Sequence, residues 1–170
     1  MKKTVAILLL ACMIFSLVSC SKDNETPKGM KDVARDENPF NFFVPQSWMS
    51  YSGDVVGAYY SVADKSNITI MPYGGDYNSS EEYWADFKTR CANEFAEFEV
   101  LTENESKIVA KTNALQYVYK MKVDGTKYQC KQYVLAYGGI LYVITYTSTE
   151  DKFESHTDDV EKMITEFKFK

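Results

Sequence analysis

The spacing of hydrophobic positions from residue 39 onward changes between two periods, and each period predicts a different element. Alternation over residues 55–63 and 67–73 predicts two strands, after a first strand at 40–45 that a proline ends. The residues expected to face inward from the two alternating strands are Val56, Ala58, Tyr60, Val62, Ile68 and Ile70.

A helix is predicted after the glycine-containing loop at residues 73–78. Ser79 and Glu82 have the spacing of a capping box, in which each side chain satisfies a free backbone N–H group. Apolar residues then recur three or four positions apart, which predicts one buried stripe on a helix of about five turns. The stripe consists of Trp84, Phe87, Cys91, Phe95 and Phe98.

Four further strand signals follow, at residues 99–110, 115–123, 128–137 and 140–147. The first is one strand or a bent pair, because Asn104 and Glu105 interrupt it. Asp124-Gly125 and Gly138-Gly139 predict tight hairpin turns. The last long strand is apolar on both faces and should be covered on both sides. A second helix is expected from Asp151 or Ser155 to Phe167, and residues 167–170 can close as a short strand. Its expected inward residues are Phe153, Val160, Met163, Ile164 and Phe167.

These elements predict an α+β fold, an antiparallel sheet of about six to seven strands with helices packed on its faces. Their order is three strands, a helix, four strands and a second helix. About 130 residues support one core, so residues 38–170 are expected to form a single domain.

The first 19 residues have the pattern of an export signal. Lys2 and Lys3 precede a near-continuous apolar run over residues 5–18. The run ends in Leu17-Val18-Ser19-Cys20, which resembles the bacterial lipobox. That resemblance implies cleavage before Cys20 and diacylation of its thiol. An ordinary secretory signal or an uncleaved anchor are the alternatives.

The polar segment that follows, residues 20–37, is interpreted as the lipidated cysteine and a flexible tether. It contains almost no large apolar side chain and includes Pro27 and Gly29. A sorting or partner-binding peptide is the alternative interpretation.

Charge and composition exclude several classes of function. The net charge of the 170 residues is −5, which argues against an electrostatic nucleic-acid binder. Loss of residues 1–19 lowers the count of basic residues from 19 to 17 against 24 acidic ones, so the mature charge is −7. The lipid, rather than a basic patch, would therefore hold the protein at the membrane. His156 is the only histidine, which excludes a multi-histidine metal site.

Few residues suggest catalysis, a metal or redox chemistry. His156 could act as a base beside Ser155, Asp158 or Asp159, but these residues also suit a helix start. Gly74-Gly75-Asp76 with Asp54 could suggest a calcium site, but the ligand spacing fits no EF-hand pattern and turn chemistry explains these residues. No catalytic residue, metal or cofactor is therefore predicted.

Two cysteines remain in the mature domain. Cys91 and Cys130 could form a disulfide in an extracytoplasmic setting. Two buried free thiols are the alternative.

The 13 tyrosines are the unusual feature of the composition. Pairs such as Tyr117 and Tyr119 are first explained by sheet packing. Tyr73, Tyr77 and Tyr83 gather near the glycine-containing loop and are the predicted edge of a binding surface. The alternative places all three in packing or scattered on the surface.

The ordered set of motifs resembles the PsbP-like α/β/α sandwiches, which include a photosystem II extrinsic subunit and many small bacterial lipoproteins. The matching segments are Phe42-Phe43-Val44-Pro45-Gln46-Ser47-Trp48, Tyr59-Tyr60-Ser61 with residues 66–70, residues 139–146 and residues 158–169. The resemblance implies a central antiparallel sheet with helices on its faces. The family has no shared catalytic residues to carry over.

The predicted function is a non-enzymatic binding or assembly module of the cell envelope, anchored outside the cytoplasm by its N-terminal lipid. Its predicted partners are the membrane, through the lipid, and an envelope protein or a small ligand. A carrier or sensor of a small apolar or sugar ligand is the alternative, and an enzyme is the weaker one.

Overall fold

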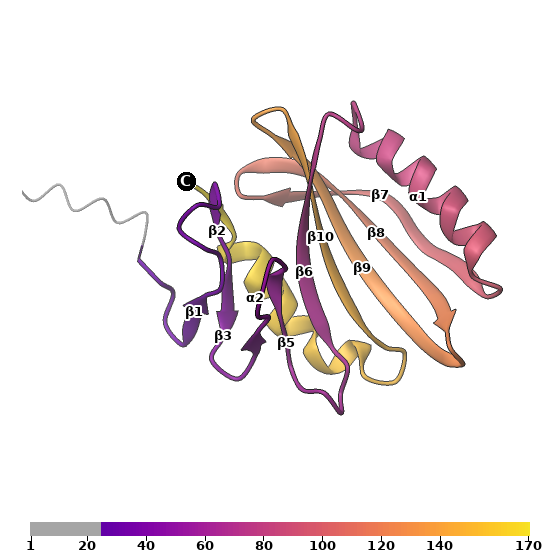
Figure 1. Ribbon diagram of the computed structural model, residues 1–170, viewed down its shortest axis with the longest axis horizontal. Coiled ribbons are helices and arrows are strands. Elements are labelled where there is room, and N and C mark those ends of the chain that lie inside the picture. The colour runs from indigo at the N-terminus through magenta and orange to yellow at the C-terminus, as the bar shows by residue number, and fades with distance from the viewer. Residues whose placement is uncertain (1–24) are drawn as a thin grey trace, which may run out of the picture.

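The computed structural model describes residues 25–170, so the predicted signal and Cys20 lie outside the described residues. Eleven strands and two α-helices make up this part of the chain (Figure 1). In chain order they are β1 (Met30–Asp32), β2 (Phe40–Asn41), β3 (Phe43–Pro45), β4 (Met49–Ser50), β5 (Val56–Tyr59), β6 (Asn67–Gly74), α1 (Ser80–Glu94), β7 (Phe98–Val109), β8 (Thr112–Val123), β9 (Thr126–Tyr137), β10 (Ile140–Thr149), a 3₁₀ turn (Phe153–His156), α2 (Thr157–Glu166) and β11 (Lys168–Phe169).

Seven of these strands form one antiparallel sheet in the order β4-β5-β6-β10-β9-β8-β7, which confirms the predicted fold class. Asp124 and Gly125, with φ angles of 48° and 80°, make the predicted hairpin turn between β8 and β9. Ala110 and Lys111 make the equivalent turn between β7 and β8 at φ angles of 50° and 62°. That turn has no glycine signal, which is why the pattern alone did not locate it.

The central strand β10 divides two hydrophobic cores, as its two-sided apolar pattern predicted. Tyr142, Ile144 and Tyr146 pack on one face with the N-terminal strands and α2. Leu141 and Val143 pack on the other face under α1. The sheet is therefore covered by a helix on each side, although each helix covers only part of its face (Figure 1).

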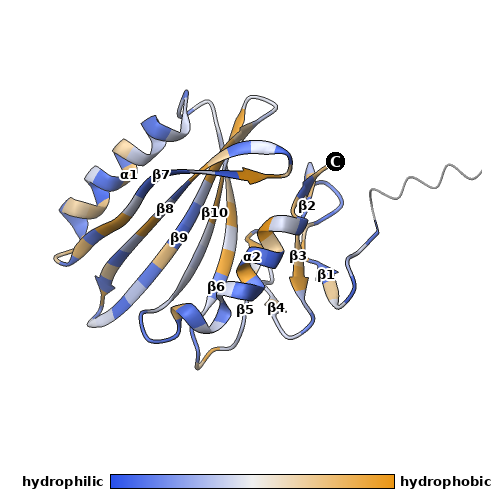
Figure 2. Ribbon diagram, turned by 180° about the vertical axis from the view of Figure 1, so that it is seen from behind, coloured by the Kyte–Doolittle hydropathy of each residue, from blue (hydrophilic) through white to orange (hydrophobic). Residues whose placement is uncertain are grey.

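The layer on the α2 side combines the C-terminal helix with short N-terminal strands. β1 pairs with β3, and β11 pairs with β2, so the predicted closing strand at the C-terminus is confirmed. Figure 2 shows α2 lying beside β3 in this layer. The predicted inward residues of the second helix are all buried, namely Phe153, Val160, Met163, Ile164 and Phe167.

Helix α1 begins as predicted but ends earlier. The Ser79 hydroxyl accepts the backbone N–H of Glu82 at 3.1 Å. The Glu82 carboxylate accepts instead from the backbone and side chain of Asn78, so only one half of the capping box forms. Phe95 is already extended and ends the helix, and Phe98 belongs to β7. The predicted stripe was therefore too long, and it missed Tyr83, which is buried.

The single strand β7 carries an irregularity where the sequence is interrupted. Its pairing with β8 shifts register between Val100 and Glu105, and Asn104 has a φ angle of 59°. The consecutive side chains Glu103 and Asn104 both accept hydrogen bonds from the α1 side of the sheet, from Trp84 and Tyr117. The bulge therefore places two consecutive polar side chains on the α1 side of the sheet, where a regular strand would direct them to opposite faces.

Two other predicted segments differ from the structure. The strand predicted at 55–63 ends at Tyr59, and Val62 lies in the following connection with 83% of its surface exposed. The expected tether is already ordered from Pro27, whose carbonyl accepts the Met30 N–H. Met30 is buried, and the Asp32 carboxylate accepts the backbone N–H of Phe42. Pairing with β3 therefore orders this segment although its sequence is polar.

Among residues 25–170, no helix has both the length and the apolar character needed to cross a membrane.

Candidate functional site

The three tyrosines predicted to edge a binding surface lie together where β6 leads into α1. Their ring centroids are 5.3–5.7 Å apart, and every pair is in contact. Tyr83 is only 2% exposed, whereas Tyr73 and Tyr77 are half-buried. Tyr83 is therefore part of the core under α1, and only Tyr73 and Tyr77 can offer surface to a partner.

Polar contacts hold this cluster in place. The Tyr77 hydroxyl donates to Asp86 at 2.7 Å, and Arg90 donates to the same carboxylate at 2.9 Å. The hydrogen bond to Asp86 raises the pKa of Tyr77, and the same bond lowers the pKa of Asp86. Burial raises the pKa of Tyr83 far above its ordinary value. Tyr77 and Tyr83 are therefore neutral, and these contacts position the cluster before any partner arrives.

Cys91 lies on the buried side of α1 and Cys130 lies on β9 beneath the helix, and both are free thiols in the structure. The Cys130 sulfur lies 3.6 Å from the Thr147 hydroxyl oxygen. Burial raises the pKa of the Cys130 thiol to about 11 and also raises that of Cys91. Protonated, buried thiols are poor nucleophiles, so the structure favours the packing interpretation of this pair.

His156 contacts a partner that the sequence did not suggest. Its Nε2 lies 3.2 Å from Asp64, in the connection between β5 and β6, rather than beside Asp158 or Asp159. The ring packs against Tyr60 and Trp48, at centroid distances of 4.2 and 5.5 Å. This contact joins the start of α2 to a loop 92 residues away in the sequence and accounts for the histidine structurally.

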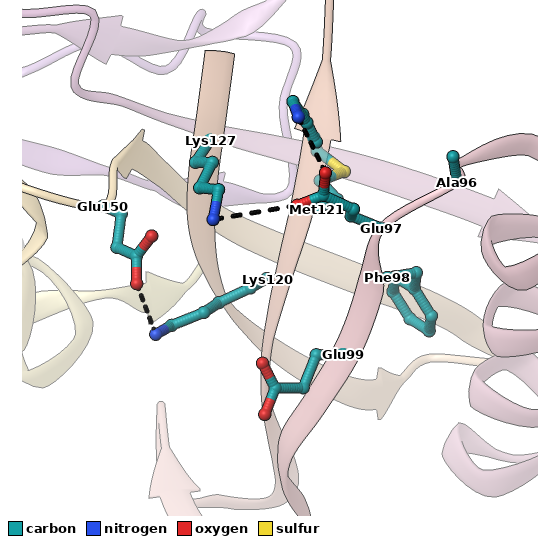
Figure 3. A pocket seen from close by; sticks show the side chains of 9 residues that line it. Ala96, Glu97, Phe98, Glu99, Lys120, Met121, Lys127 and Glu150 are labelled. Atoms are coloured by element: carbon teal, nitrogen blue, oxygen red, sulfur yellow. Dashed lines mark hydrogen bonds and ion pairs between the residues drawn. The ribbon is translucent and has the colours of Figure 1, made fainter. Parts of the chain in front are cut away.

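A pocket of about 320 Å³ lies at the end of the sheet where β7 begins and β8 ends (Figure 3). Lys120 pairs with Glu150 at 2.6 Å, and Lys122 pairs with Glu97 at 2.7 Å. Lys127 lies 3.7 Å from Glu97 as well. Three acidic and three basic side chains line this pocket, and all of them except Glu99 are paired, so the pocket offers no field of one sign to a ligand.

A second groove, which we name the tyrosine groove, was not found from the sequence. It has a volume of about 420 Å³ and lies between β4 and the connection from β5 to β6. Its lining residues are Ser50, Tyr51, Ser52, Tyr59, Ser61, Val62, Lys65 and Asn67. The centroids of the Tyr51 and Tyr59 rings are 5.2 Å apart.

The sequence held one signal for the tyrosine groove. Tyr59 has the opposite parity to Val56 and Ala58, which are buried toward α2, so the alternation placed it on the other face. The expectation that the strand continued to residue 63 concealed the groove, because it assigned Tyr60 and Val62 to the core.

No protein-family model and no curated protein matches this sequence. Solved structures do match. CyanoP, the cyanobacterial PsbP of Synechocystis sp. PCC 6803, has a TM-score of 0.58 at 12% identity, over 91% of this chain and 99% of its own.

Two further solved structures match over most of their lengths. LpqN of Mycobacterium tuberculosis has a TM-score of 0.55 at 15% identity, over 82% of this chain and 90% of its own. Mog1p, a Ran-binding protein of Saccharomyces cerevisiae, has a TM-score of 0.57 at 11% identity, over 82% of this chain and 95% of its own.

The chain has the PsbP/Mog1 fold. The PsbP-like resemblance seen in the sequence is thereby confirmed at the level of the fold. At 11–15% identity, the PsbP/Mog1 fold describes the architecture and assigns no site to this chain.

Proposed function

We propose that this protein is a non-enzymatic binding module of the cell envelope, held outside the cytoplasm by a lipid on Cys20. The observation that carries the proposal is the export signal ending in Leu17-Val18-Ser19-Cys20, followed closely by a folded body. A lipid anchor needs a spacer only long enough to keep the domain off the bilayer surface.

The spacer is shorter than the sequence suggested. Pro27 already belongs to the turn that receives Met30, and Gly29 accepts the backbone N–H of Gln46. Seven residue steps from Cys20 to Pro27 span at most about 25 Å. The anchored domain would therefore work within one domain diameter of the membrane surface.

The charge of the mature chain and the shared fold support the same proposal. A net charge of −7 disfavours direct contact with anionic lipid, so the body would face away from the headgroups toward other components. LpqN is described as involved in cell envelope biogenesis, and Mog1p is described as Ran-binding. This fold therefore occurs in proteins described by binding and by envelope roles.

The anchoring is tested by fatty-acid labelling in a bacterial host that acylates lipoproteins. The wild-type chain should incorporate an alkyne fatty acid and fractionate with membranes, and Cys20→Ala should lose both properties. Cys12→Ala is the matched control, because it removes a cysteine of the same segment and should leave labelling intact. Labelling that persists in Cys20→Ala would refute the anchor.

The location is tested on spheroplasts with a membrane-impermeant amine reagent. The lysines of this protein should react while those of a cytoplasmic marker stay unlabelled. Protection equal to that of the marker would contradict an extracytoplasmic location.

The binding role is tested at the cluster of Tyr73, Tyr77 and Tyr83, which is separate from the tyrosine groove. Because Tyr83 is a core residue, the useful variant is Tyr73→Ser with Tyr77→Ser, and the control is Leu101→Ser on the exposed part of β7. In solubilised membranes, a complex larger than the monomer should be lost only in the tyrosine variant. If the complex survives the tyrosine change, the partner binds elsewhere; if wild type shows none, the assembly role is wrong.

A further inference from the structure

We propose that the tyrosine groove binds a carboxylated saccharide, that is, a sugar ring bearing an acid group. This inference names a ligand class and a site beyond the envelope role, and it does not depend on the lipid anchor. It rests on the shape, the aromatic pair, the hydroxyl groups and the single charge of the groove.

The size of the tyrosine groove suits a small ligand. Its volume of about 420 Å³ lies in the range of ligand pockets, which is roughly 300–1,000 Å³. It is formed by β4, β5 and the beginning of β6 on the edge of the sheet that α1 does not cover. A Cβ atom at Gly57 would lie 2.2 Å from the Ile68 carbonyl oxygen, so glycine is required for the close pairing of β5 and β6 here.

The aromatic pair provides the surface on which a sugar ring can pack. Tyr51 and Tyr59 are half-buried, and their rings are tilted by 39° at a centroid distance of 5.2 Å. Burial, with a smaller contribution from Tyr59, raises the pKa of Tyr51, so its hydroxyl is neutral. A sugar ring has apolar C–H faces and polar edges, and it can place a face on such rings while its hydroxyl groups reach the rim.

The remaining lining is polar rather than apolar. Ser50, Ser52 and Ser61 contribute hydroxyl groups, and Val62 is the only aliphatic side chain of the lining. Asn67, at the beginning of β6, donates its amide N–H to the Lys65 carbonyl at 3.2 Å, and this hydrogen bond orients the amide in the groove. A ligand rich in hydroxyl groups can pair with these donors and acceptors, whereas an apolar ligand would leave them unpaired.

The charge of the groove is positive, although the chain is acidic. Lys65 is the only charged residue in the lining, in a sequence with 24 acidic residues. The neighbouring carboxylate of Asp64 is directed to His156 and to the Ser66 N–H, at 3.2 Å each. The ammonium of Lys65 is therefore the group that would select a carboxylate on the sugar.

The test is calorimetric titration of the full chain, purified in detergent. The probes are trigalacturonic acid, a hyaluronan tetrasaccharide and sialyllactose, and the matched neutral probe is the methyl ester of trigalacturonic acid. At least one acidic saccharide should bind with millimolar or tighter affinity. Its neutral form should bind roughly threefold to fivefold more weakly, the range of an exposed ion pair.

Three variants separate this site from other surfaces. Tyr59→Leu should weaken binding by roughly tenfold, because it removes the ring contact. Lys65→Gln should abolish only the preference for the acid over its ester, and 1 M salt should do the same. Tyr137→Leu is the control, because Tyr137 is exposed at the far end of β9 and stacked on Phe169.

The outcomes decide between the alternatives. Binding that is equal for acid and ester, or unchanged by Tyr59→Leu in a folded variant, overturns the proposal. Failure of all three acidic probes overturns it as well, and binding of a neutral aromatic probe alone would assign the groove to an apolar ligand. Because the measurement uses no membrane, its failure leaves the labelling result on Cys20 unaffected.

Discussion

Replacement of Trp84 by alanine should destabilise the domain more than any other change on α1. Trp84 is buried under the helix and stacks on Tyr117 at a centroid distance of 4.2 Å and an angle of 14°. Its indole N–H donates to the Glu103 carboxylate at 2.6 Å. One side chain thus provides both the packing and a charge-assisted hydrogen bond between α1 and the bulge of β7.

The size of the effect follows from these contacts. Truncation of a buried tryptophan to alanine costs about 3–5 kcal/mol. Glu103 would keep its ion pair with Lys88 at 2.6 Å, so no unpaired buried charge adds to this cost. In a chain of this length, each kcal/mol lowers the melting temperature by about 2–4 °C, so we expect a fall of roughly 6–20 °C. Trp84→Phe keeps most of the packing and should cost about 1.5–3 kcal/mol.

The comparison is made by urea unfolding followed by circular dichroism, on the chain from residue 21 onward. Phe95→Ala is the matched control. The periodic stripe alone would give Phe95 the cost of a fully buried ring, but it is a half-buried residue at the end of the helix, so about 1–2 kcal/mol is expected. If Trp84→Ala shifts the midpoint no more than Phe95→Ala, this account of α1 docking is refuted.

Three further predictions concern other parts of the fold. Burial alone would raise the pKa of Asp64, but hydrogen bonds from Ser66 and His156 outweigh it and lower that pKa. The stability that this carboxylate contributes is therefore present above about pH 4 and lost below it. Asp64→Asn should reduce the fall of the unfolding midpoint with decreasing pH, and an unchanged pH dependence would exclude this role. Lys111→Gly should stabilise the hairpin turn by about 1 kcal/mol in calorimetry, because Lys111 has a φ angle of 62°, whereas an equal or lower melting temperature would show that the turn is unstrained. Cys91 and Cys130 should react with Ellman's reagent only after unfolding, because both thiols are buried, and a pair that stays unreactive in denaturant would establish a disulfide instead.

Local patterns were sufficient to predict most of the fold. The two-sided apolar run of β10 predicted a strand covered on both faces, and the structure places it between two cores. The Asp124-Gly125 turn was also predicted from local sequence, because few residue types adopt the positive φ angles of a tight hairpin turn without strain. In both cases, the structure of the segment is determined by residues that are adjacent in the sequence.

Other features depended on contacts between distant segments. The polar stretch around Met30 is ordered because it pairs as a strand with β3, whose residues lie 11 to 15 positions further along the chain. The composition of the stretch itself does not indicate this pairing. Helix α1 ends at Glu94 because Phe98 pairs with Met121, which draws the chain into the sheet before the apolar stripe is complete.

The candidate sites show the same division. The apolar run that resembles an export signal, the acidic composition and the excess of tyrosine are all read from the sequence, because they are properties of residue type and local order. Which tyrosines face solvent depends on tertiary packing, which buries Tyr83 between α1 and the sheet and brings Tyr51 next to Tyr59 across a strand pair. Exposure is set by what packs on a residue from elsewhere in the chain, and periodicity can predict the face of an element but not whether that face is covered.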